Sequence, residues 1–343
     1  MLNILFTTEN GPTKRIYFPT AAIAILGKLG TVTYNEGQEP LSEAQLSQMI
    51  AGMDVCITHW GCPQFSEPIL ARADRLRLIA HAAGSVGDLV TPGVYARGIR
   101  VCSANPIMAK YVAESVLAYI LAGLKQLPQQ AEDMKIHKLW RGRQDLKSLY
   151  QAHIGLVGLG TIGKFLLDLL QPFHVEIKIY DPYVSSAVLA GYPHVTLAPL
   201  EEVLAWGEVI SIHASLTSET RGMLDADRLA LIRDGALLVN TARGPIVDEL
   251  ALIRELQSGR LNAVLDVYST EPLPPESPLR QLNNVITFPH TAGNTERGVE
   301  MTYAILEEIE RFAKGEPLQY EIPFDQFKLM TREREFKIYN SAQ

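Results

Sequence analysis

Three polar side chains suited to acid–base and carboxylate chemistry each follow a predicted buried strand. They are Arg243, Glu271 and His290, and the strands before them are predicted at 236–240, 263–267 and 285–288. A guanidinium can bind a carboxylate through two parallel hydrogen bonds. An imidazole titrates near neutral pH, and a neighbouring carboxylate raises its pKa and fixes its tautomer. The set predicts a site where Arg243 binds an anionic substrate and His290, supported by Glu271, exchanges a proton.

Each of these residues alone has an ordinary explanation. Arg243 could bridge loop carboxylates, Glu271 could be a solvated loop acid, and a loop histidine such as His290 is usually inert. Their common placement favours the functional interpretation, because the carboxyl ends of parallel strands meet at one rim of a sheet, where open α/β sheets bind ligands.

A glycine-rich segment lies between the predicted strand 153–157 and an apolar helix predicted at 165–170. Its spacing is Gly158-x-Gly160-x-x-Gly163, and the next predicted strand, 175–180, ends at Asp181, eighteen residues after Gly163. This order is the fingerprint of a dinucleotide-binding strand–helix–strand unit. Gly158 permits a tight turn, Gly160 lets the backbone approach a pyrophosphate, and Gly163 lets helix and strand pack closely. The helix N-terminus offers free N–H groups to phosphates.

The acid at the end of the second strand predicts which dinucleotide binds. The Asp181 carboxylate can accept the hydroxyls of the adenosine ribose, and it would repel a 2′-phosphate. Residues 182–186 contain no Arg or Lys that could hold such a phosphate. A glycine triplet alone also occurs in ordinary turns, but the complete order of elements predicts NAD rather than NADP.

Composition restricts the classes of function. The chain has 343 residues, 47% hydrophobic and 20% charged, which predicts two globular domains. A net charge of −7 argues against nucleic-acid binding. Three scattered cysteines predict neither a disulfide framework nor a metal site. The N-terminus does not resemble a signal peptide, and we expect no apolar run long enough for a membrane span, so the cytoplasm is the expected compartment.

Short apolar strands alternate with helices along the whole chain, which predicts an α/β fold with two doubly wound parallel-sheet domains. Five strands are expected before residue 104 and six between 153 and 288. A helix predicted at 299–312 and the tail after it are too short to form a domain. We therefore predict a discontinuous first domain of 1–104 plus 299–343, with a second domain, 105–298, inserted into it. The active site is expected in the cleft between the two domains.

The motifs together resemble the D-isomer-specific 2-hydroxyacid dehydrogenase family over nearly the whole chain. The resemblance rests on the segments 157–163, Tyr180-Asp-Pro182, 213–220, 240–249, 265–272 and Pro289-His290. It implies a Rossmann NAD-binding domain inserted into a flavodoxin-like substrate domain. It also implies that Arg243 binds the substrate carboxylate and carbonyl, that Glu271 supports His290 as the acid–base group, and that Asp266 holds the nicotinamide carboxamide. Further cofactor contacts are implied for Thr161, Ile162, Ala214, Ser215, Thr220, Thr241 and Ala242.

The same resemblance implies a homodimer joined through the helix and arm at 108–150. Two positions depart from the family pattern: Ser215 stands where proline is usual, and the substrate loop reads Ala83-Gly-Ser-Val-Gly-Asp88. Backbone N–H groups of Ser85, Val86 and Gly87 are the expected substrate donors.

The function expected from the resemblance is NAD-dependent interconversion of a small 2-oxo acid and its D-2-hydroxy acid. The loop His59-Trp-Gly-Cys62 suggests an apolar or aromatic substrate side chain rather than a phosphorylated one. The alternative is an NAD(H)-sensing, corepressor-like binding module on the same fold with little or no turnover.

Overall fold

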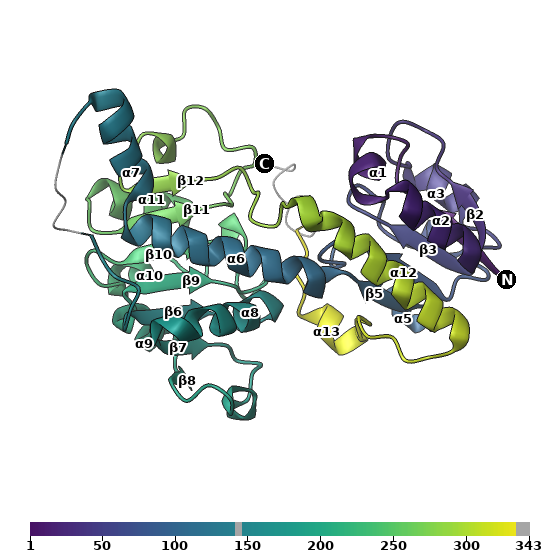
Figure 1. Cartoon of the computed structure of the whole chain (residues 1–343). Coiled ribbons are helices and arrows are strands. Elements are labelled where there is room, and N and C mark those ends of the chain that lie inside the picture. The colour runs from purple at the N-terminus through teal and green to yellow at the C-terminus, as the bar shows by residue number, and fades with distance from the viewer. Residues whose placement is uncertain (141–145, 334–343) are drawn as a thin grey trace. The chain divides into compact units, whose positions relative to one another are not determined.

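A computed structural model of the chain describes residues 1–140 and 146–333. Contacts between residues divide the chain into two compact units (Figure 1). Unit 1 comprises Met1–Ala109 and the segment that begins at Thr295, and unit 2 comprises Lys110–Asn294. The domain bounds predicted from the sequence put these two crossings at 104/105 and 298/299.

Unit 1 is built on a five-stranded sheet in which every paired strand is parallel. The strands are β1 (Leu2–Phe6), β2 (Gly30–Tyr34), β3 (Val55–Thr58), β4 (Leu78–His81) and β5 (Arg100–Ser103). Their order, β2-β1-β3-β4-β5, is that of flavodoxin-like doubly wound sheets. The helices are α1 (Pro12–Tyr17), α2 (Thr20–Leu29), α3 (Glu43–Met49), α4 (Glu67–Leu70), α5 (Pro92–Ala96), α12 (Val299–Lys314) and α13 (Phe324–Lys328).

Unit 2 is built on a seven-stranded parallel sheet of order β12-β11-β10-β9-β6-β7-β8. The strands are β6 (His153–Val157), β7 (Glu176–Tyr180), β8 (Val195–Leu197), β9 (Val209–Ile212), β10 (Leu237–Asn240), β11 (Asn262–Leu265) and β12 (Val285–Thr287). The strand order reverses at β6, as in a Rossmann sheet, which confirms the predicted fold class. The expected number of six strands is wrong, because the short edge strand β8 has only three residues, too few for a clear periodic pattern.

The C-terminal part of the chain packs on unit 1. On α12, Met301, Ile305 and Ile309 are buried in the core that covers one face of the sheet. Farther along, Ile322 donates its N–H to Val101 O, and Phe327 joins the core on the other face. The rest of the predicted tail, 334–343, and residues 141–145 of the predicted dimer arm lie outside the described residues.

The helix α6 (Asn105–Leu124) is the longest in the described parts of the chain. Its 20 residues and mean hydropathy of 1.5 are enough, by length and composition, to cross a membrane, so the expectation of no such apolar run is wrong. A helix of this length spans about 30 Å, which matches a small domain as well as a bilayer. In unit 2 it packs on the sheet, where a Cβ on Gly123 would lie 2.6 Å from Leu237 and 3.2 Å from Val264.

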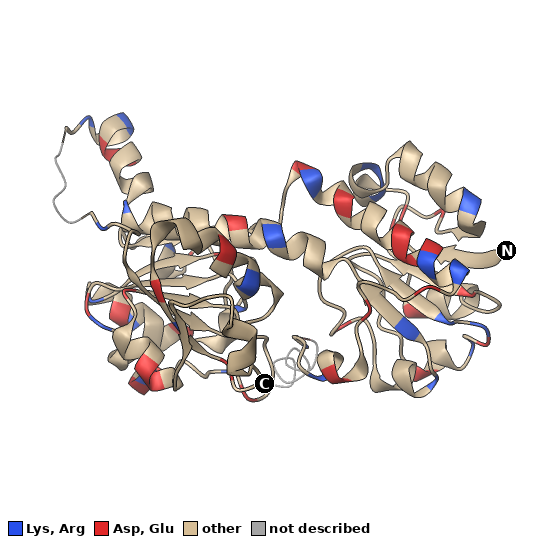
Figure 2. Ribbon diagram, turned by 60° about the horizontal axis from the view of Figure 1, so that its bottom comes forward, with Lys and Arg blue, Asp and Glu red and all other residues tan. Residues whose placement is uncertain are grey.

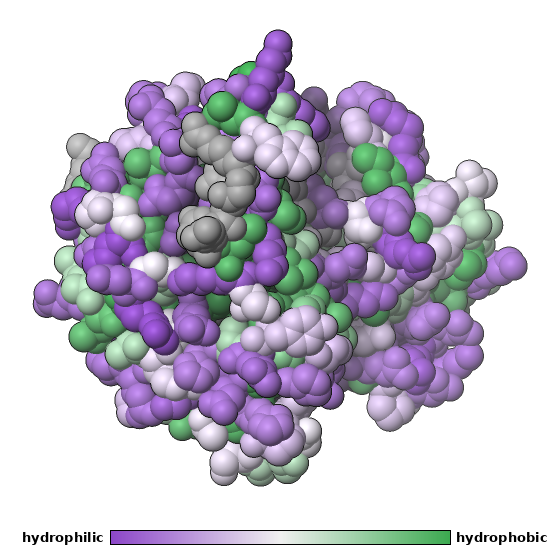
Figure 3. Space-filling model, turned by 60° about the vertical axis from the view of Figure 1, so that its left-hand side comes forward, coloured by the Kyte–Doolittle hydropathy of each residue, from purple (hydrophilic) through white to green (hydrophobic). Residues whose placement is uncertain are grey.

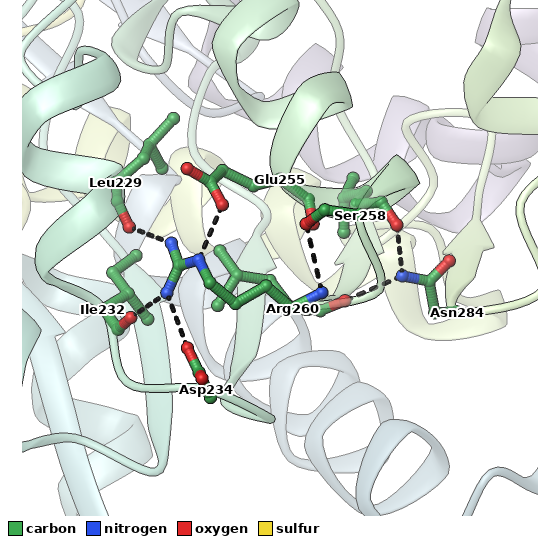
Figure 4. Close-up of polar contacts among 9 residues, drawn as sticks. Leu229, Ile232, Asp234, Glu255, Ser258, Arg260 and Asn284 are labelled. Carbon is green, nitrogen blue, oxygen red and sulfur yellow. Dashed lines mark hydrogen bonds and ion pairs between the residues drawn. The ribbon is translucent and has the colours of Figure 1, made fainter.

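Arg260 joins two helices to the sheet of unit 2 (Figure 4). It lies between α11 (Glu249–Gln257) and β11 and donates to the carbonyl oxygens of Leu229 (2.6 Å) and Ile232, at the end of α10 (Ala226–Leu231). Its guanidinium also binds the carboxylates of Glu255 (2.6 Å) and Asp234 (3.4 Å). These bonds satisfy carbonyl groups that a helix end leaves without helical partners.

Charged residues of both signs are interspersed over both units (Figure 2). On the face shown in Figure 3, hydrophobic residues lie among hydrophilic ones.

Candidate active site

The candidate acid–base pair lies at the carboxyl end of the sheet of unit 2. His290 follows β12 and Glu271 follows β11, and these strands are neighbours. The His290 Nδ1 and Glu271 Oε2 atoms are 2.8 Å apart, within hydrogen-bond distance. The two side chains are 43% and 36% exposed, so the pair is open to a ligand. Because Nδ1 faces the carboxylate, Nε2 is the ring nitrogen left to meet a substrate.

The pair holds opposite charges more readily than isolated side chains would. The hydrogen bond with Glu271 raises the pKa of His290 above its usual value, against burial and nearby Arg243, which lower it. Burial would raise the pKa of Glu271, but hydrogen bonds from His290 and the Tyr268 N–H lower it below its usual value. The contact therefore favours a protonated imidazole beside an ionised carboxylate more than isolation of either side chain would.

The backbone of His290 is held in an uncommon conformation. Its φ of 54° is in the left-handed region, which costs a non-glycine residue about 1–2 kcal/mol. Asp266 compensates, because its two carboxylate oxygens accept the N–H groups of Thr291 (2.9 Å) and Ala292 (3.0 Å). Asp266 is fully buried directly after β11. It thus fixes the loop that presents the imidazole, while its implied contact with a nicotinamide carboxamide stays a prediction.

Tyr268 connects the same two loops. Its backbone N–H donates to Glu271 Oε1 (3.0 Å), and its hydroxyl lies 2.8 Å from Phe288 O. A Cβ on Gly244 would lie 2.0 Å from the Tyr268 carbonyl carbon, so only glycine fits beside it. Tyr268 therefore contacts the loop after each of the three strands β10, β11 and β12.

Arg243 follows β10, the next strand of the sheet, and its guanidinium acts on both members of the pair. It lowers the pKa of Glu271 and that of His290 through its charge. Its Nη1 donates to Ala242 O at 2.6 Å. The three predicted catalytic side chains are thus brought together within unit 2, and an anionic group beside Arg243 would lie near the imidazole.

The glycine-rich loop leaves an opening beside Gly160 at the start of α8 (Thr161–Leu170). Gly158 has a φ of 96°, and a Cβ there would lie 2.7 Å from Ala214 N, so no larger residue fits. Beside Gly160, the space within 4 Å of a Cβ position is open. The first helical N–H bond runs from Lys164 to Gly160 O, which leaves the N–H groups of the first turn, 161–163, without helical partners. This is the geometry that binds a pyrophosphate.

Asp181 also contacts this loop. Its carboxylate accepts the N–H of Leu159 (2.7 Å), in the glycine segment, and that of Tyr183 (2.9 Å). The acid is therefore held beside the turn, and its remaining lone pairs can accept ribose hydroxyls. Thr220, another predicted contact, donates its hydroxyl to Ser215 O (2.5 Å) and so fixes the loop after β9.

Two buried polar atoms that follow neighbouring strands of the same sheet have no hydrogen-bond partner within the described ranges. They are His213 Nδ1, after β9, and Thr241 Oγ1, after β10. Burial lowers the pKa of His213 to about 4, so the ring is neutral and can donate or accept. Buried polar atoms usually have partners. A glycine cradle, free helical N–H groups and two unsatisfied buried atoms together fit a dinucleotide.

Comparisons with known proteins agree with this geometry. A sequence model of the D-isomer specific 2-hydroxyacid dehydrogenase NAD-binding domain matches residues 117–292, about half of the chain. The chain is 30% identical to a glyoxylate reductase of Thermofilum pendens, across 81% of this chain and 83% of that protein. The chain belongs to the D-isomer specific 2-hydroxyacid dehydrogenase family.

Other similar proteins differ from this chain in length or match it in fold. A D-3-phosphoglycerate dehydrogenase of Methanocaldococcus jannaschii is 30% identical over 86% of this chain, but the match spans only 56% of that protein. The chain thus spans about half the length of several curated relatives that it matches. The TT0316 protein of Thermus thermophilus has a similar structure, with a TM-score of 0.77 and 27% sequence identity. The match covers 94% of this chain and 100% of that chain.

The predicted substrate donors of this family member lie in unit 1, after β4. The Gly87 N–H donates to Ser85 Oγ (3.2 Å), and a Cβ on Gly87 would lie 1.9 Å from Thr331 O. Val86 is fully buried, whereas Ser85 is partly exposed. Their role toward a substrate stays a prediction.

The structural roles of Tyr268, of the unpartnered His213 Nδ1 atom and of Asp266 as the anchor of the His290 loop were not predicted from the sequence. For Tyr268, the local signal is its position two residues after Asp266, the acid that follows β11. The other two depend on contacts between residues far apart in the chain and left no local pattern.

Proposed function

We propose that this family member is an NAD-dependent oxidoreductase that interconverts a small 2-oxo acid and its D-2-hydroxy acid. The observation that carries the proposal is the 2.8 Å contact between His290 Nδ1 and Glu271 Oε2, beside Arg243 at the same rim. A protonated imidazole and a guanidinium at one place suit a substrate with a carboxylate and an adjacent carbonyl.

Arg243 binds and orients the substrate in this proposal. Its planar guanidinium pairs with the substrate carboxylate and polarises the carbonyl oxygen. In the direction of reduction, His290 donates its Nε2 proton to that oxygen as the carbonyl carbon gains a hydride. In oxidation, neutral His290 removes the hydroxyl proton. Glu271 keeps Nδ1 protonated in both directions and stabilises the charged ring.

The dinucleotide would be held by the residues around the glycine segment. The N–H groups at the start of α8 bind the pyrophosphate, Asp181 accepts the adenosine ribose hydroxyls, and His213 and Thr241 offer hydrogen bonds to the remaining polar groups. When bound, the nicotinamide supplies or accepts the hydride. The carboxylate at position 181 favours NAD over NADP.

The loops at the carboxyl edge of the unit 1 sheet support a proposal for the substrate class. The segments 7–11, 59–63 and 82–88 contain no Lys or Arg. Burial lowers the pKa of His59 to about 4 and that of His81 to about 3, so neither ring carries a charge near neutral pH. Trp60 is 46% exposed beside Tyr17, with ring centroids 5.5 Å apart. We infer a 2-oxo acid with an apolar or aromatic side chain and no phosphate.

The protein is proposed to act as a homodimer. On α7 (Leu127–Glu132) and in the segment after it, Leu127, Met134, Ile136 and Trp140 are between 51% and 91% exposed. Large exposed apolar side chains grouped on one segment are typical of an interface. Light scattering should give twice the chain mass of 37.9 kDa, and a monomeric mass would refute this part of the proposal.

Steady-state NADH oxidation with a panel of 2-oxo acids tests the function. The panel includes glyoxylate, pyruvate, hydroxypyruvate, 3-phosphohydroxypyruvate and phenylpyruvate, with chiral analysis of the product. We expect turnover with unphosphorylated acids, a D-configured product and a preference for NADH over NADPH. Tight NADH binding without turnover of any acid would contradict the proposal and favour the NAD(H)-sensing alternative, which the comparisons do not favour.

A further inference from the structure

The segment 288–292, which presents His290, is held at both ends by one helix of unit 2. At one end, the ring of Phe288 stacks on that of Tyr119, with centroids 4.3 Å apart and planes within 10°. At the other end, Ala292 O accepts the hydroxyl of Ser115 at 2.8 Å. His290 lies between these two attachments.

The two helix residues share one face of α6. Ser115 and Tyr119 are four residues apart, so they lie one above the other on the helix. Gly123, another four residues on, packs against Leu237 and Val264 of the sheet, which fixes the rotation of this face. The helix can therefore hold the loop in one place.

Tyr119 also reaches the anchor of the loop. Its hydroxyl lies 3.5 Å from Asp266 Oδ1, the oxygen that accepts the Thr291 N–H. Burial and the nearby Asp266 charge raise the pKa of Tyr119 to about 12, so the hydroxyl keeps its proton as a donor. The helix α6, the Asp266 carboxylate and the segment 288–292 thus form one connected cluster around His290, whose backbone is left-handed.

We propose that Ser115 and Tyr119 are positioning residues, through which α6 holds the segment 288–292 so that the imidazole of His290 stays against Glu271. The inference rests on the catalytic role proposed for His290. In this proposal, the hydroxyls of Ser115 and Tyr119 do not contact the substrate or the dinucleotide. Their removal is expected to misplace the acid–base group while leaving ligand binding intact.

The test compares the double variant Ser115→Ala/Tyr119→Phe with the wild type. Misplacement of a catalytic group by a fraction of an ångström lowers the rate steeply, so we expect kcat to fall about tenfold. The KM for the 2-oxo acid and the Kd for NADH should stay within about twofold. A matched control is Ser258→Ala/Tyr192→Phe, which removes one Ser and one Tyr hydroxyl elsewhere in unit 2 and should keep the wild-type kcat.

A second measurement does not need turnover. NMR titration of the imidazole, assigned with His290→Gln, should give a pKa in the double variant that is lower than in the wild type. The charged groups that act on His290 are Glu271, Arg243 and Asp266, and none of them is changed. A shifted pKa would therefore report a weakened contact with Glu271. If the wild type turns over no acid, the proposed function fails, but this titration still decides the inference.

An unchanged kcat together with an unchanged His290 pKa would overturn the inference, even if the melting temperature falls. If the double variant does not fold, the single variants Tyr119→Phe and Ser115→Ala take its place, and each should show part of the loss. Ser115→Thr keeps a hydroxyl and should restore kcat relative to Ser115→Ala.

Discussion

At His290, the hydrogen bond between Nδ1 and Glu271 decides which ring nitrogen can exchange a proton with a substrate. A general acid typically contributes two to four decades to the rate. His290→Ala should therefore lower kcat by roughly 10²–10⁴-fold in the reduction of the preferred 2-oxo acid. His153→Ala is a suitable control, because this half-exposed ring stacks on Trp206 at the other end of β6. A near-wild-type rate in His290→Ala would remove the residue from the mechanism.

The raised pKa of His290 predicts how the rate depends on pH. Reduction needs the protonated ring, so kcat/KM should be constant below the His290 pKa and fall about tenfold per pH unit above it. Glu271→Gln removes the negative charge that favours protonation, so the break should move to lower pH. The measurement is the pH profile of NADH oxidation for both proteins. A break that stays in place would mean that another group titrates.

Asp181 is predicted to select the cofactor by charge. Asp181→Asn keeps an oxygen for the Leu159 or Tyr183 N–H but removes the repulsion of a 2′-phosphate. Relief of that repulsion at a short distance should improve binding of NADPH relative to NADH by about tenfold or more. Fluorescence titration with the two reduced dinucleotides measures the ratio. An unchanged ratio would show that the ribose is held elsewhere.

At the scale of the elements, Arg260 adds polar contacts to α10 and α11 beside the buried apolar residues of both helices. Arg260→Ala would leave two carbonyl groups and the partly buried Glu255 without their donor. We expect a loss of about 2–3 kcal/mol in the stability of unit 2. Hydrogen exchange of the β10 and β11 amides should measure it. The control is Arg233→Ala, which removes an exposed ion pair with Glu208 at 4.0 Å and should cost less than about 1 kcal/mol in stability. An equal loss of stability in both variants would contradict this account.

The elements were predictable wherever a long apolar pattern specified them. β1 has the predicted bounds, since it lies between parallel neighbours and all of its residues except Asn3 are apolar. The apolar pattern of residues 112–124 predicts a helix, but α6 begins earlier, at Asn105, because Pro106 fits the first turn of a helix. β8 escaped prediction because it is short and lies at the sheet edge.

The sequence predicts which strand each candidate catalytic residue follows, but not the backbone conformation that presents it. The positions of Arg243, Glu271 and His290 follow from where parallel strands stop. The left-handed backbone of His290 does not, because it depends on Asp266 and on Tyr119, which lies 147 residues from Asp266 in the chain. Contacts of this range leave no local signal in one sequence.

At the scale of the whole molecule, every residue predicted to bind the dinucleotide belongs to unit 2, and unit 2 is continuous in the chain. Its first helix and its last segment are joined by the Ser115–Ala292 hydrogen bond and by the stacked rings of Tyr119 and Phe288. Its seven-stranded sheet has its own core. Unit 1, in contrast, needs segments from both ends of the chain.

These facts predict that residues 105–294, produced alone, fold and bind NADH without reducing any 2-oxo acid. The dissociation constant should lie within about tenfold of that of the full chain, a difference of about 1.4 kcal/mol. Circular dichroism and NADH fluorescence test folding and binding separately. Gly158→Ala in the same fragment is the control, since a Cβ there meets Ala214 N at 2.7 Å and should abolish binding. A folded fragment that binds no NADH would show that unit 1 contributes to the dinucleotide site, and an unfolded one would show that the two units fold together.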